Sequence, residues 1–141
     1  MKKTLSSRIL AGVLCLGFAA ALCPMVAAYA GNSGDTPFSF NLSYWQSSDT
    51  ENRAKYDYTS SYVNCTSNTG TATVQSNGYQ MGSVYTWGPE YPVGRDAQYI
   101  DNYVMENRPR TDVTAYCFLR FHNKNYNYTI HTEGLWSPDS I

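Results

Sequence analysis

Residues that commonly carry catalysis or hold metals are scarce in this sequence. Its 141 residues include only four cysteines and two histidines. It contains no Cys-x-x-Cys pair, nucleophile elbow, Walker loop, zinc-protease helix or dinucleotide fingerprint. Asp96, Asp101 and Glu106 lack the alternating oxygen ligands and the central glycine of a calcium loop. We therefore predict a protein without catalytic residues, bound metal or cofactor.

The N-terminal segment has the three parts of a secretory signal peptide. Residues 1–8 carry three basic residues and no acidic one, and a nearly unbroken apolar run follows. Ala28 and Ala30 then supply the small residues of a cleavage site. The alternative is a retained membrane anchor, because the apolar run approaches the roughly 20 residues that span a bilayer. Pro24 interrupts that run, so we predict a signal peptide over residues 1–30, cleavage after Ala30, and a secreted protein without stable membrane insertion.

Basic residues are also few in the remaining chain. Removing residues 1–30 takes away three of the ten basic residues and none of the eleven acidic ones, which leaves a net charge of −4. Arg108, Arg110 and Arg120 are the nearest thing to a basic group, and we interpret them as solvated charges on strand edges. Nucleic-acid binding depends on clustered Lys and Arg, so it is disfavoured. The 111 residues that remain predict one small domain over residues 31–141.

The two cysteines outside the predicted signal peptide are Cys65 and Cys117. Two cysteines in a small exported domain predict a single disulfide, because the compartment is oxidising. It would close a loop of about fifty residues and contribute on the order of 4 kcal/mol. Free structural thiols, a zinc site and a catalytic thiol with His122 or His131 as base are the alternatives. Cys117 lies among apolar residues, a setting that raises a thiol pKa and disfavours catalysis.

The hydrophobic pattern predicts an all-β domain. In the segment 37–45, Phe38, Phe40, Leu42 and Tyr44 alternate with polar residues, as in a half-buried strand. The same alternation in the segment 112–121 predicts a strand with these residues on one face: Val113, Ala115, Cys117, Leu119 and Phe121. In the segment 126–136 the alternating residues are Tyr126, Tyr128 and Ile130. We predict about six to eight strands in a small antiparallel β-sandwich or a partly closed barrel.

Turn-forming residues divide the predicted strands. Asn77-Gly78 predicts a tight type I′ hairpin turn, and the segment 88–96, with two prolines and two glycines, predicts a loop. Residues 48–53 are polar and indicate a turn or a short helical turn. The segment 97–108 fits either a helical stripe or a strand, and its aromatic and β-branched content favours a strand.

Aromatic residues are abundant, with twelve Tyr, three Trp and four Phe after residue 30. Most of them are expected to fill the core and rim of a small β domain, because tyrosine is a good strand former. The surplus could form a binding surface around Tyr85, Trp87 and Tyr91, where an amphipathic ring offers a large contact area. Trp136 either docks the C-terminal segment on the domain or adds to this surface.

Histidine chemistry is the remaining candidate. His131 and Glu133 lie two residues apart on a predicted strand and therefore point the same way, and His122 is nearby in sequence. A metal site or an acid–base pair is conceivable. A solvated histidine next to a glutamate is the commoner arrangement. A secreted hydrolase is a further alternative, and these three residues are the only candidates for its catalytic groups.

Three segments carry a resemblance to a known family. The stretches "TPFSFNL", "NYVMENR" and "GLWSPDSI" resemble a domain-of-unknown-function family of small secreted proteins from Gram-positive bacteria. The resemblance covers essentially the whole chain after the signal peptide. It implies secretion and a β-rich domain, and it offers no assigned activity or catalytic residues to carry over. In size and aromatic content the chain is also similar to secreted lactococcin-like β-sandwich bacteriocins, although it lacks their basic charge balance.

These observations predict a non-enzymatic, extracellular interaction protein or bacteriocin-like protein. The alternative is a carbohydrate or cell-wall binding module that uses tyrosine and tryptophan side chains. The predicted partner is accordingly a cell-surface protein or a cell-wall glycan.

Overall fold

Nine β-strands in two antiparallel sheets make up the part of the chain that the computed structural model describes, residues 31–140. The predicted all-β class is confirmed. The sheets are not closed into a barrel, so the sandwich is the correct one of the two predicted architectures. The predicted signal peptide, residues 1–30, lies outside the described residues.

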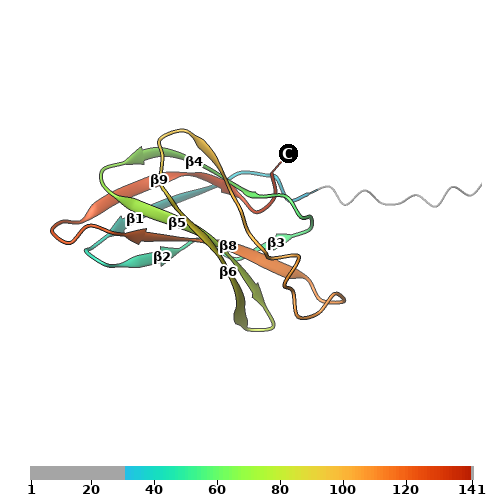
Figure 1. Ribbon diagram of the computed structural model, residues 1–141. Coiled ribbons are helices and arrows are strands. Elements are labelled where there is room, and N and C mark those ends of the chain that lie inside the picture. The colour runs from blue at the N-terminus through green and yellow to red at the C-terminus, as the bar shows by residue number, and fades with distance from the viewer. Residues whose placement is uncertain (1–30, 141) are drawn as a thin grey trace, which may run out of the picture.

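The two sheets form the two layers of the molecule (Figure 1). Sheet A contains, in spatial order, β1 (Thr36–Leu42), β9 (Ile130–Ser137), β4 (Ser61–Asn68) and β7 (Ala97–Ile100). Sheet B contains β2 (Ser47–Asp49), β8 (Ala115–Asn123), β5 (Ala72–Gln80) and β6 (Ser83–Pro92), and the short β3 (Arg53–Lys55) also pairs with β8. Because β8 pairs with three other strands, its register positions most of sheet B.

The hydrophobic core lies between the sheets and follows the period-two pattern of the sequence. Phe38 and Leu42 of β1 are buried, and the Phe38 ring stacks on Phe121 of β8 with ring centroids 4.5 Å apart. This contact joins the two layers. The inward residues of β8 are buried as predicted: Ala115, Cys117, Leu119 and Phe121. Tyr44 falls beyond the end of β1 and is exposed, because the chain turns there.

The predicted hairpin exists, but its turn was placed four residues too early. Asn77 and Gly78 lie inside β5, and the two-residue turn between β5 and β6 is Met81-Gly82. Both turn residues have positive φ, 53° for Met81 and 87° for Gly82, as a type I′ turn requires. Gly78 instead lies at a β-bulge, where an added Cβ would come within 2.6 Å of the Thr86 side chain. A glycine needed for close approach was therefore mistaken for a turn glycine.

The turn predicts opposite effects for two substitutions. Met81→Asn should raise the free energy of unfolding by up to about 1 kcal/mol, because Asn tolerates positive φ better than Met does. Gly82→Ala should lower it by about 1 kcal/mol, because Ala is strained in that conformation. Urea unfolding of the two variants checks both. Equal stabilities of the two variants and the original protein would contradict the turn geometry.

The segment 88–96 was predicted as a loop, yet β6 continues through Gly88 and Pro89 to Pro92. Proline is tolerated there because β6 is an edge strand with one unpaired side. Gly88 and Pro89 together oppose the single residue Ser76, so the strand bulges at this point. A Cβ on Gly88 would collide with the Ser76 carbonyl oxygen, which explains the glycine.

Two other segments also differ from prediction. Residues 48–53, predicted as a turn, contribute to β2 and β3, which pair with β8 and raise the strand count above the expected six to eight. The segment 97–108 is strand only over Ala97–Ile100, after which Asn107 N donates to Tyr103 O at 3.0 Å in a single turn. Tyr126 and Tyr128 lie in an exposed loop, so the last strand starts at Ile130.

Candidate functional site

Cys65 and Cys117 do not form the predicted disulfide; both are free, buried thiols. Cys117 of β8 lies 3.3 Å from Ser61 Oγ, at the start of β4, whereas Cys65 is four residues further along that strand. Four residues of strand span about 13 Å. A disulfide requires Cα atoms within about 7 Å. The prediction was wrong because the sequence did not show which residue of β4 faces Cys117.

Each thiol has its own polar surroundings. Cys117 Sγ lies 3.1 Å from Ser76 Oγ, and Ser61 and Ser76 are joined by a hydrogen bond of 2.8 Å. Cys65 Sγ donates to Ser67 O at 3.0 Å. Burial raises the pKa of the Cys117 thiol, more than the hydrogen bonds from the two serines lower it. The arrangement favours an inert thiol and provides no nucleophile that a substrate could reach.

Alkylation under two conditions tests this assignment. Neither Cys65 nor Cys117 should react with iodoacetamide in the folded protein, because both are buried. Both should react fully in denaturant without a reducing agent. Mass spectrometry of the peptides gives the extent of labelling. A Cys65–Cys117 peptide pair that requires reduction before it can be alkylated would contradict the structure.

The histidines do not gather into one site. His131 and Glu133 are brought together on β9, with His131 Nε2 3.1 Å from Glu133 Oε2 and Nδ1 3.0 Å from Asn41 Oδ1. His122 lies on β8 in the other sheet. Within residues 31–140 no group of three or more His, Cys, Asp or Glu is placed to hold a metal ion. The same residues include no helix long and apolar enough to cross a membrane.

The four residues predicted to form a binding surface are separated by the structure. Trp136 is fully buried in the core, where it docks the C-terminal segment, and is therefore removed from the predicted surface. Tyr85 and Tyr91 pack against the core, and their hydroxyls donate to Val104 O and Asp101 Oδ2. Burial raises the pKa of Tyr85 to about 12. Of the four, only Trp87 is about half exposed.

Trp87 belongs to a different surface, the outer face of sheet B. Trp45, in the turn between β1 and β2, is 47% exposed and Trp87 is 49% exposed. Between them lie outward residues of β8, which alternate with its core residues. We name this surface the aromatic face and define it by Trp45, Trp87, Tyr116, Phe118, Arg120, His122 and Tyr126. Phe118 is only 3% exposed, because the Arg120 guanidinium lies over its ring. A shallow groove of about 160 Å³ lies next to Phe118.

The two tryptophan rings are held by their neighbours. The Arg120 guanidinium lies over Trp87 at 4.8 Å from the ring centroid. Arg120 is itself held by Asp49, with two hydrogen bonds of 2.7 Å each. Trp45 packs against His122 at 5.3 Å and meets Tyr126 edge-on at 4.9 Å between ring centroids. The rings are therefore preorganised as well as exposed.

Trp45 also has an unusual backbone conformation. Its φ is 53°, in the left-handed region that a bulky residue rarely adopts. The turn is closed by Gln46 N donating to Ser43 O at 3.1 Å and by Ser43 N donating to the Gln46 side chain at 2.9 Å. Such a conformation costs about 1–3 kcal/mol and persists where the surroundings hold it. It turns the indole ring onto the aromatic face.

Charged groups beside the aromatic face form a second cluster. Glu90 of β6 accepts hydrogen bonds from Lys124 Nζ at 2.9 Å and Thr73 Oγ1 at 2.8 Å. Both contacts hold the pKa of Glu90 below its ordinary value, and the hydrogen bond from Lys124 has the larger effect. Burial lowers the pKa of His122, and the charge of Lys124 lowers it further, although Glu90 acts in the opposite direction. The folded protein therefore favours neutral His122.

His122 makes stability depend on pH. Its folded pKa lies below its ordinary value, so the unfolded chain takes up the proton first. The contribution of His122 is thus present above about pH 6.5 and is lost as the pH falls through the folded pKa. We expect His122→Gln to lose less stability than the original protein between pH 7.5 and 5.5, measured by urea unfolding. Equal losses would contradict this assignment.

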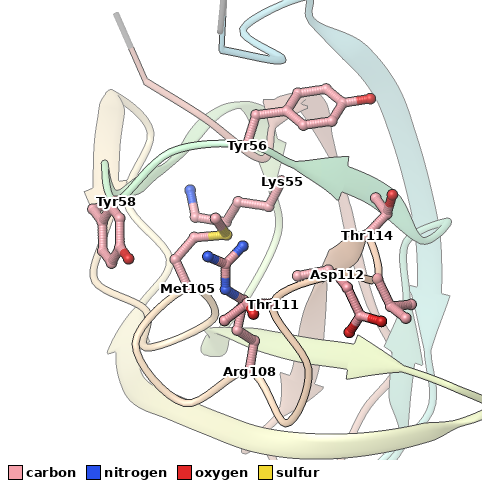
Figure 2. A pocket seen from close by; sticks show the side chains of 10 residues that line it. Lys55, Tyr56, Tyr58, Met105, Arg108, Thr111, Asp112 and Thr114 are labelled. Atoms are coloured by element: carbon pink, nitrogen blue, oxygen red, sulfur yellow. The ribbon is translucent and has the colours of Figure 1, made fainter.

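A cleft of about 450 Å³ lies at one end of sheet B, between β3 and the connection from β7 to β8. Figure 2 shows the guanidinium of Arg108 in the middle of this cleft, near Met105 and Thr111. Tyr58 and Asp112 lie on its two sides. We call this the Arg108 cleft; it shares no residue with the aromatic face.

Lys55, one of the residues that line the Arg108 cleft, forms a buried ion pair. Lys55 and Asp139 both have fully buried side chains, and Lys55 Nζ lies 2.8 Å from Asp139 Oδ1. The ammonium also donates to the carbonyl oxygens of Thr59 and Pro138, each at 2.7 Å. Asn32 N donates to Asp139 Oδ2, which ties the first described residues to the C-terminal end (Figure 1). All three Lys55 donors are used, so this group has a structural role.

Sequence reasoning missed most of the aromatic face. Arg120 was interpreted as a solvated charge and His122 as possible metal or acid–base material, and Trp45 was not considered. A signal was nevertheless present, because Tyr116, Phe118, Arg120 and His122 alternate with the predicted core residues of the same strand. These alternate positions point away from the core and therefore indicated the residues of β8 that form the aromatic face.

The fold and this surface define a class: a small antiparallel β-sandwich with two preorganised tryptophans on one outer sheet face. The chain belongs to the family of proteins of unknown function DUF2712, whose family model matches residues 26–140. The predicted membership of a family of unknown function is confirmed. Neither the curated proteins nor the solved structures contain a significant match to the chain.

Proposed function

We propose that this chain is a non-enzymatic binding protein that a Gram-positive bacterium exports, and that it acts at or beyond the cell surface through the aromatic face. The observation that carries the proposal is the pair of half-exposed rings, Trp45 and Trp87, each held in place by neighbouring side chains. Aromatic residues and arginine are the residue types that contribute most to binding at interfaces. The signal-peptide pattern in the sequence of residues 1–30 supports the location.

The way Arg120 is held supports binding in particular. A flexible arginine would lose conformational freedom when a partner docks, and that loss weakens affinity. Here the two hydrogen bonds to Asp49 and the stacking on Trp87 have already fixed the side chain. The contact area of the face is thus available at low entropic cost. A cell-surface protein is the partner we propose first.

A cell-wall glycan is the second candidate ligand. Polar groups lie beside the rings of the aromatic face: Asp49 holds Arg120, Glu90 pairs with Thr73 and Lys124, and His122 packs against Trp45. Sugars present both apolar ring faces and hydroxyl groups, so a site that combines flat aromatic rings with polar side chains suits them. The net charge of −4 after residue 30 favours a neutral polymer over an anionic membrane surface.

Binding to cells tests the proposal. Labelled protein should bind intact Gram-positive cells saturably. Loss of binding after protease treatment of the cells would identify a protein partner, and binding to isolated cell-wall polysaccharide would identify the glycan. Growth inhibition in a parallel culture would identify a bacteriocin-like role. The absence of saturable binding to cells and to polysaccharide would overturn the proposal.

A further inference from the structure

We propose that the Arg108 cleft is a second binding site, which takes a carboxylate group through the guanidinium of Arg108. The site lies apart from the aromatic face, so it goes beyond the proposed function and can fail without it. Its ligand is a small molecule or chain end with one carboxylate on an apolar or ring-shaped body.

The unused hydrogen-bonding capacity of Arg108 is the first part of the argument. A guanidinium has five N–H donors, and Arg108 is half-buried, so part of its hydration is removed. Within residues 31–140 it makes no hydrogen bond and no ion pair. The cleft holds the group in its middle and leaves space in front of it (Figure 2).

The other charges of the cleft are already neutralised. Lys55 uses its three donors on Thr59, Pro138 and Asp139. Asp112, in the wall of the cleft, accepts two hydrogen bonds from Arg110, at 3.0 Å and 2.5 Å. Arg108 is therefore the one charged group that lines the cleft without an ionic partner in the described chain. An anion entering the cleft would meet an unopposed positive charge.

The surroundings favour a carboxylate over a phosphate. The planar fork of a guanidinium matches a carboxylate with two parallel hydrogen bonds. A phosphate can carry two negative charges, and the lining of the cleft offers only one cation without a partner, Arg108, so its second charge would stay unmatched. Thr111 and Thr114 add hydroxyl donors, whereas Met105 and Tyr58 provide surfaces for the body of the ligand.

NMR titration of the 15N-labelled protein tests the site with two pairs of probes. N-acetylglycine is compared with N-acetylglycinamide, and glucuronic acid with glucose, so that each carboxylate has a neutral control. We expect saturable shifts at Arg108 Nε and at the amides of Thr111 and Thr114 with the carboxylates only. The tighter of the two carboxylates indicates whether a peptide end or an acidic sugar is the natural source.

Variants decide whether Arg108 is responsible. Arg108→Gln should weaken carboxylate binding by about tenfold or more, because a charge-assisted pair is lost. Arg108→Lys should bind with intermediate affinity, because it keeps the charge and loses the fork. Arg95→Gln removes an exposed positive charge elsewhere and should bind as the original protein does. Unchanged spectra outside the cleft show that each variant is folded. If Arg108→Gln does not fold, Arg108→Lys takes its place in the comparison.

Three results would overturn the proposal. The first is that neither carboxylate shifts the amides of the cleft. The second is that Arg108→Gln, or Arg108→Lys in its place, binds the carboxylate as tightly as the original protein does. The third is that inorganic phosphate binds in preference to both carboxylates. None of these results bears on binding through the aromatic face.

Discussion

Asp139→Asn should lower the free energy of unfolding by about 3–5 kcal/mol, because it leaves the ammonium of Lys55 buried without its closest countercharge. The Nζ–Oδ1 distance is 2.8 Å and neither side chain is exposed to solvent. Asp57, at 3.8 Å, is a more distant and partly exposed substitute. The same carboxylate accepts hydrogen bonds from Asn32 N and Tyr56 N, which the asparagine can retain only in part.

Urea unfolding measures this loss, and the chain offers a matched control. Arg110 and Asp112 form a hydrogen-bonded pair on the surface, with more than half of each side chain exposed. Asp112→Asn should leave stability almost unchanged, because exposed ion pairs contribute little. If the two variants had the same stability, the buried pair would not be the anchor of the C-terminal segment that the structure indicates.

Replacing both Trp45 and Trp87 by alanine should weaken binding to cells or to the polysaccharide by about a hundredfold or more, since a central aromatic residue commonly contributes about 2 kcal/mol or more. The loss should appear mainly as faster dissociation. Stability should change little by comparison, because both rings are about half exposed and the core is untouched. Surface plasmon resonance on immobilised polysaccharide or partner gives both rates.

The matched control is a pair of tyrosines on the opposite face of the sandwich. Tyr62 and Tyr99 lie side by side on sheet A, with ring centroids 5.8 Å apart. Tyr99 is 61% exposed and Tyr62 is partly buried, so their replacement by alanine removes surface aromatic area without touching the aromatic face. If the tyrosine variant lost as much affinity as the tryptophan variant, binding would be a property of exposed aromatic surface in general.

Local patterns in the sequence were sufficient for the fold class. The alternation in β1 and β8 marks the buried side of each strand, because a sheet with one face on the core requires period two. Features that depend on a neighbouring strand were not accessible in this way. Pro89 can be part of a strand only because β6 lies at an edge, and Gly78 lies inside β5 because Thr86 approaches it closely.

The candidate site was harder to predict for the same reason. The Cys65–Cys117 disulfide assumed that the two strands meet at Cys65, whereas Cys117 faces Ser61. Trp45 contacts His122 across a gap of 77 positions in the chain, a contact that only the pairing of β2 with β8 creates. Position on an outward face can be derived from a sequence; the partner of an outward residue cannot.

The segments that carry the family resemblance have structural roles here. In the 102–108 segment, Val104 and Met105 are part of the core, and Arg108 lines the Arg108 cleft. In the last segment, Trp136 is buried and Asp139 pairs with Lys55. These segments hold the two sheets and the chain ends together. The aromatic face is built from other parts of the chain, whereas the Arg108 cleft takes Met105 and Arg108 from one of these segments.

The most direct test of binding through the aromatic face is an NMR footprint of the bound ligand on the 15N-labelled protein. Soluble cell-wall fragments or the captured partner are added, and the amides that shift or broaden are mapped onto the two sheets. We predict that they lie on the outward residues of β2, β5, β6 and β8 and on the turn containing Trp45. A footprint on sheet A, around Tyr62, Tyr99 and His131, would contradict the account.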